Sequence, residues 1–80
     1  VAVVTGGAGS EVAKVAAAGI GTFITGEGAH WSYPLAEELG VNLLYGGHYA
    51  TETFGVRALS EHLAATHGVP CSFIDHPTGL

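Results

Sequence analysis

Residues 41–52 read VNLLYGGHYATE, an apolar run that meets two glycines and then the start of a long segment of helical character. The run at 41–45 does not alternate strictly between apolar and polar residues, which is typical of a strand covered on both faces by helices. Gly46 and Gly47 allow a sharp turn after it. The stretch therefore predicts a strand, a tight turn and a helix, the repeating unit of an α/β fold.

Three further apolar runs have the same character. They are VAVVT at 1–5, TFIT at 22–25 and CSFI at 71–74. Segments with helix signals separate the runs, so the expected order is β-α-β-α-β-α-β. Because crossovers between parallel strands are right-handed, we expect a mostly parallel sheet with helices packed on it.

Capping residues predict the ends of three helices. Ser10 is suited to cap the first helix and Gly19 to follow it. The second begins near Pro34 and stops at Gly40, and the third runs from about Ala50 to His67, before Gly68. The third helix carries an apolar stripe at Val56, Leu59 and Leu63.

The size of the chain limits what it can do alone. It has 80 residues, of which 48% are hydrophobic and 13 are glycine. A chain of this length buries only about 60% of the surface that its unfolded form exposes, so its core is marginal without further chain or a partner. The sequence contains no methionine and opens at Val1 in an apolar run, which indicates a piece of a larger protein. We expect residues 1–80 to form one α/β segment of it.

The charge balance excludes several partners. The net charge is −5, and the only basic residues, Lys14 and Arg57, are far apart in the sequence. Binding to nucleic acid or to an anionic membrane surface requires clustered cations, so neither is expected. The single cysteine, Cys71, permits no internal disulfide, and no apolar run is long enough for a membrane helix. We therefore expect a cytoplasmic protein.

The glycine-rich turn TGGAGS, residues 5–10, offers one functional alternative. A strand that runs into such a turn is how dinucleotide-binding folds present backbone N–H groups to a pyrophosphate, and Glu27 stands where a ribose-binding acid would lie. The third glycine of the fingerprint is absent, because Val12 occupies its place. We interpret TGGAGS as a tight turn between a strand and a helix. A nucleotide-binding oxidoreductase is the less favoured hypothesis.

The segment GGHYATE carries the strongest chemical signal. His48 and Glu52 are four positions apart, so a helix beginning near His48 places both side chains on one face, where they can share a cation. The carboxyl end of a parallel strand is also where open α/β sheets place their ligands. The alternative is structural: His48 caps the turn and Glu52 stabilises the helix N-terminus.

Several motifs together resemble one family. They are TGGAGS after a strand, FITGE followed by His30, GGHYATE leading into FGVRALSEHL, and the final FIDHPTGL. The combination resembles the Nif-three-like (NGG-one-interacting-factor-three-like) dinuclear metal-centre proteins, often labelled GTP cyclohydrolase 1 type 2 homologues. The resemblance covers essentially the whole chain and implies that it is the C-terminal part of a larger fold of that family.

The resemblance also implies a site. It assigns His48 and Glu52 as two ligands of a dinuclear centre, whose remaining ligands, a histidine pair and a carboxylate, come from sequence outside this chain. Glu27 and His30 are candidates for hydrogen-bonding to these ligands, and Glu27 is the better of the two because it ends a strand on the same edge of the sheet. The family segment often leads to paired histidines, whereas Trp31 follows His30 here, which weakens a direct metal role for His30.

The implied cofactors are two divalent metal ions, with zinc, iron and manganese all compatible with imidazole and carboxylate ligands. The implied activity is metal-dependent hydrolysis of an unknown small molecule, for which the GTP label is weak support. The alternative is a non-catalytic, metal-stabilised scaffold or regulatory protein. The implied partners are the remainder of the same protein and further copies in a homo-oligomer, such as a hexameric ring. The isolated chain is expected to be inactive.

Overall fold

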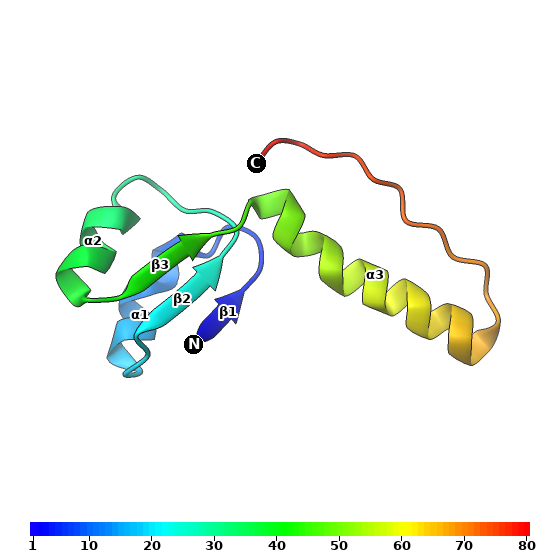
Figure 1. Cartoon of the computed structure of the whole chain (residues 1–80), viewed down its shortest axis with the longest axis horizontal. Coiled ribbons are helices and arrows are strands. Elements are labelled where there is room, and N and C mark those ends of the chain that lie inside the picture. Colours follow the sequence, from blue (N-terminus) through cyan, green and yellow to red (C-terminus); the bar gives the residue numbers. More distant parts are fainter.

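The computed structural model describes residues 1–80 as a three-stranded sheet with two short helices on it and a third helix that leaves it (Figure 1). The elements in chain order are β1 (Ala2–Val4), the 3-10 helix η1 (Gly9–Glu11), α1 (Val12–Ala17), β2 (Thr22–Thr25), α2 (Ser32–Leu39), β3 (Asn42–Tyr45) and α3 (His48–His67). The strands are all parallel, in the order β1-β2-β3. The predicted α/β class with a parallel sheet is confirmed.

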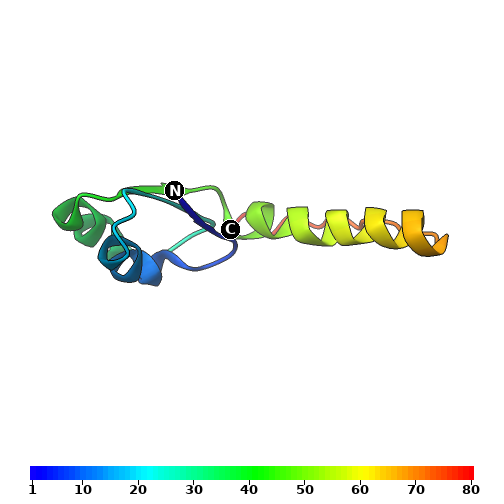
Figure 2. The same cartoon turned by 90° about the horizontal axis from the view of Figure 1, so that it is seen from below.

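The core lies between the sheet and the two short helices. Ala2, Phe23 and Leu43 are neighbours in the strand register, and they belong to the face that α1 and α2 cover (Figure 2). Phe23 and Val12 are fully buried where this face meets α1. The strand residues therefore reach the core at every second position, as the pleat requires.

The opposite face of the sheet is open in this chain. Val3, Ile24 and Leu44 are in register on it, and Val3 is 66% exposed. The prediction that helices cover both faces is wrong for these residues. The reason is topological: the strands follow one another in order across the sheet, so two right-handed crossovers place both helices on the same side.

The helix ends agree with the capping residues better at the C-termini than at the N-termini. Gly40 and Gly68 adopt left-handed conformations with φ of 68° and 64°, as predicted. The starts differ: α2 begins at Ser32 and α3 at His48, two residues before the expected positions. Ser10 caps no helix, because it lies inside η1.

The predicted fourth strand, 71–74, is absent. The chain after α3 has no regular secondary structure and returns alongside that helix (Figure 1). A strand needs a neighbour with free backbone N–H and C=O groups, and a helix uses these groups internally. The contact is instead made by side chains: the guanidinium carbon of Arg57 lies 4.1 Å from the centre of the Phe73 ring.

Helix α3 has no buried residue and projects away from the sheet (Figures 1 and 2). Its predicted apolar stripe is not packed in this chain, since Val56 and Leu59 are each more than half exposed. None of the helices combines the length and the apolar character that are needed to cross a lipid bilayer.

Candidate metal centre

Backbone hydrogen bonds tie together the carboxyl ends of the three strands. The N–H of Glu27, after β2, donates to the carbonyl of Gly6, after β1, over 3.0 Å. The N–H of Gly47, after β3, donates to the carbonyl of Gly26 over 2.9 Å. The three turns therefore form one surface at the edge of the sheet where parallel folds place their sites.

His48 and Glu52 face each other on this surface. Gly47 has a φ of 93°, which few side chains tolerate, and this turn makes His48 the first residue of α3. Glu52 follows one helical turn later, and its Oε1 lies 3.2 Å from His48 Nε2. The helical spacing expected from the sequence is therefore present.

The distance between these two atoms fits a shared cation. Ligand bonds of about 2.1 Å that meet at angles of about 90–110° place two donor atoms about 3.0–3.4 Å apart. The observed 3.2 Å lies in that range. Both side chains are partly exposed, 37% for His48 and 55% for Glu52, so an ion and further ligands can reach them.

Glu27 contacts the other side of the imidazole. Its Oε1 lies 2.7 Å from His48 Nδ1, so the ring is held at both nitrogens. This hydrogen bond is the largest cause of a His48 pKa raised above 6.5; partial desolvation opposes it, and the negative charge of Glu52 adds to it. The structure therefore joins three of the four residues singled out in the sequence.

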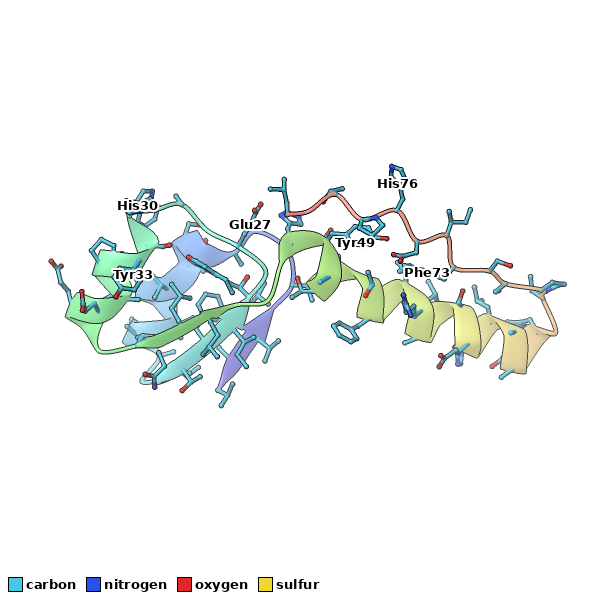
Figure 3. The ribbon with its side chains drawn as sticks, turned by 45° about the horizontal axis from the view of Figure 1, so that its top comes forward. Glu27, His30, Tyr33, Tyr49, Phe73 and His76 are labelled. Carbon is cyan, nitrogen blue, oxygen red and sulfur yellow. The ribbon has the colours of Figure 1, made fainter.

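His30 is the fourth, and it stays apart. It is exposed, and its side chain makes no hydrogen bond or ion pair. Figure 3 shows it beside α2, separated along the loop from Glu27. The hypothesis that His30 supports the candidate ligands finds no contact here, because α2 begins at Ser32, two residues later, and carries the chain away from the strand ends.

No group of three or more metal-binding side chains converges on one point in the chain. Glu27 does not add a third ligand to the pair, because it occupies the ring nitrogen opposite the one that faces Glu52. The chain thus presents two candidate donors to a cation, His48 Nε2 and Glu52 Oε1.

Thr51 belongs to the site although no motif in the sequence pointed to it. Its hydroxyl accepts a hydrogen bond from the Gly6 N–H over 3.0 Å and donates one to the His48 carbonyl over 3.1 Å. It therefore fixes the turn after β1 to the first turn of α3. Its position between His48 and Glu52 could have predicted this role, because a threonine in the first turn of a helix can hydrogen-bond to a backbone carbonyl one turn earlier.

The glycines of TGGAGS make close contacts inside the protein. A Cβ atom on Gly6 would lie 2.5 Å from Glu52 Oε1, and one on Gly7 would lie 3.4 Å from His48 Cε1. A Cβ on Gly9 would lie 2.5 Å from both the Gly28 Cα and the Tyr45 hydroxyl. The turn therefore packs against the candidate ligands, His48 and Glu52, and against the neighbouring loop.

The segment after α3 borders the same surface. Thr78 and Leu80 join Glu27, His48, Tyr49 and Glu52 around a cleft of about 340 Å³. Tyr49 holds the segment: its N–H donates to the Leu80 carbonyl over 3.0 Å, and its hydroxyl donates to Asp75 over 2.7 Å (Figure 3). The candidate ligands thus lie at one wall of an open cleft.

The sequence as a whole matches the family model for Duf34/NIF3 (NGG1p interacting factor 3) over residues 1–79. The chain belongs to the Duf34/NIF3 family. The resemblance drawn from the motifs is therefore confirmed at the family level.

Family members with solved structures and curated names extend the match. The chain is 50% identical over 80 residues to a "GTP cyclohydrolase 1 type 2 homolog" of Halobacterium salinarum and 42% identical to one of Deinococcus radiodurans. It is 46% identical to TTHA1606 of Thermus thermophilus, with a TM-score of 0.88 over 98% of the chain. It spans 31%, 30% and 31% of these three proteins. The fold is thus a part of a larger one.

Proposed function

We propose that this part of the protein supplies two ligands, His48 and Glu52, to a dinuclear divalent-metal site that the remainder of the protein completes. The observation that carries the proposal is the 3.2 Å separation of His48 Nε2 and Glu52 Oε1 at the strand ends. A two-donor set leaves coordination positions for ligands from outside these residues, and zinc, iron and manganese all accept mixed imidazole and carboxylate ligands.

The proposed chemistry is hydrolysis of a small molecule. Paired divalent cations act as Lewis acids and stabilise negative charge that develops on oxygen. His48 and Glu52 would bind the ions from one side. The TGGAGS turn, which lies against both side chains, would restrict their conformations. The name shared by the relatives makes GTP the first substrate to test with the intact, metal-loaded protein.

The test of the site is the metal content of the intact protein. His48→Ala and Glu52→Ala each remove one of the two proposed donors, so elemental analysis should find less bound metal in both. His62→Ala and Glu61→Ala are matched controls, since both residues are exposed on the same helix. Full metal content in the His48 and Glu52 variants, with the fold intact, would contradict the proposal.

A second candidate function rests on the surfaces that this chain leaves open. The uncovered sheet face and the unburied α3 favour a metal-stabilised scaffold that assembles with the remainder of the protein and with further copies, such as a hexameric ring. Light scattering of the intact protein with and without chelator tests it. A metal-dependent oligomer without hydrolytic activity would favour the scaffold.

For both candidate functions we propose a cytoplasmic location, where the exposed Cys71 stays reduced.

A further inference from the structure

The imidazole of His48 is held at both ring nitrogens by carboxylates from different elements. Glu52, on α3, faces Nε2 at 3.2 Å, and Glu27, in the loop after β2, faces Nδ1 at 2.7 Å. A histidine that binds metal through one nitrogen often donates its other N–H to a carboxylate, which fixes the tautomer and raises the basicity of the ligand nitrogen. Nε2, beside Glu52, is therefore suited to bind metal, and Nδ1 is suited to donate its hydrogen to Glu27.

Glu27 is itself fixed by the glycine turn. Its N–H donates to the Gly6 carbonyl over 3.0 Å, and its carbonyl accepts from the Gly9 N–H over 3.0 Å. Both backbone groups of this residue are therefore bound to the loop after β1. Because its backbone is already fixed, Glu27 does not have to lose backbone freedom when the metal binds.

The same turn forms a wall beside the ring. A Cβ on Gly7 would lie 3.4 Å from His48 Cε1 and 3.8 Å from Glu27 Cγ, so the glycine backbone lies against both groups. Gly6, with a φ of 70°, leaves room for Glu52 in the same way. The turn that resembles a dinucleotide-binding loop thus lies against the histidine and its two carboxylates on one side.

We infer that Glu27 is a positioning residue for the metal site, held by the TGGAGS turn, that accepts the Nδ1–H of His48 and directs the Nε2 lone pair at the cation. The inference rests on the proposed function, because it assigns Nε2 as the metal-binding atom. It gives the glycine-rich turn a role, which is to preorganise a metal ligand.

Zinc titration of the intact, metal-free protein tests the inference. Glu27→Ala should weaken zinc binding by about 10–100-fold, the usual effect of losing such a carboxylate. Glu27→Gln should recover most of the loss, because its amide oxygen can still accept the Nδ1–H. Glu38→Ala, an exposed glutamate on α2, is the control and should bind zinc as the unaltered protein does.

A second measurement reports the tautomer directly. In nitrogen-15 NMR spectra of the zinc-loaded protein, His48 should carry its proton on Nδ1, and Glu27→Ala should weaken the hydrogen-bond signature of that proton. If His48→Ala abolishes zinc binding while Glu27→Ala leaves affinity and spectrum unchanged, the positioning role is wrong and the metal site stands. If neither substitution affects zinc binding, the proposed site itself is wrong.

Glycine variants separate the role of the turn from general destabilisation. Gly6 and Gly19 both have positive φ, of 70° and 75°, but a Cβ would meet Glu52 only at Gly6, since nothing lies within 4 Å at Gly19. Gly6→Ala should therefore weaken zinc binding about tenfold or more, whereas Gly19→Ala should not. Equal zinc affinity in the two variants would overturn the claim that the turn holds the ligands in place.

Discussion

Residues 1–47 and residues 48–80 are stabilised in different ways. The first region has a core, in which Phe23 and Val12 are fully buried between the sheet and its two helices. The second region has no buried residue, and α3 projects beyond the sheet with its apolar side chains exposed. The candidate metal centre lies where the two regions meet. The first region is therefore stabilised by its own core, whereas the second depends on contacts at the junction, such as the Gly6–Thr51 hydrogen bond.

The largest expected effect contrasts two phenylalanines. Phe23→Ala should lower the free energy of unfolding of the 80-residue chain by about 3–5 kcal/mol, because it opens a cavity in the core. Phe54→Ala, on α3, should change it by less than about 0.5 kcal/mol, since Phe54 is 72% exposed. Urea unfolding monitored by circular dichroism measures both. Similar losses would mean that α3 packs against the sheet in solution.

The next effect concerns the junction itself. Gly26 lies so close to the Gly6 and Gly47 carbonyls that a Cβ there would force backbone to move. Gly26→Ala should therefore destabilise the protein by about 1–3 kcal/mol, as overpacking does. Gly21→Ala is the matched control, because nothing lies within 4 Å of its added Cβ. Urea unfolding measures the stability of both variants. A Gly26→Ala variant as stable as Gly21→Ala would contradict the close packing around Gly26.

A smaller effect is expected from the segment that follows α3. The Tyr49 hydroxyl donates to Asp75 and accepts from the His76 N–H over 2.8 Å. Tyr49→Phe removes both bonds, each worth about 0.5–1.5 kcal/mol, so hydrogen exchange at the His76 amide should become faster. Tyr33→Phe, at an exposed tyrosine on α2, should not change it. Unchanged exchange in Tyr49→Phe would show that the segment is held by other contacts.

The smallest effect is a pH dependence of the metal-free protein. Glu27, followed by the charge of Glu52, raises the pKa of His48 above 6.5 against partial desolvation. The pKa of His48 is higher in the folded than in the unfolded protein. Its contribution to the stability of the fold is therefore fully present below pH 6.5 and is lost as the pH rises through the folded-state pKa. NMR titration of the His48 ring should show this raised pKa, and Glu27→Ala should lower it. A His48 pKa that Glu27→Ala leaves unchanged would contradict the assigned cause.

The comparison also explains which sequence signals succeeded. Apolar runs predicted β1, β2 and β3, and left-handed glycines at Gly40 and Gly68 ended the helices where expected. These features are local, because burial of a strand and the φ of a glycine follow from a few neighbouring residues. The run at 71–74 carried the same signal and forms no strand, because pairing needs a neighbour that the local sequence does not supply.

The α/β class, the family and the spacing that puts His48 and Glu52 on one helix face all follow from the order of residues along the chain. Three further features follow only from how the elements pack: Glu27 reaches His48 Nδ1, Thr51 ties the turn after β1 to α3, and His30 stays apart. The helical pair is set by a fixed repeat along one element. The other contacts join residues of different strand ends, and their distances depend on how parallel strands align, which no local pattern specifies.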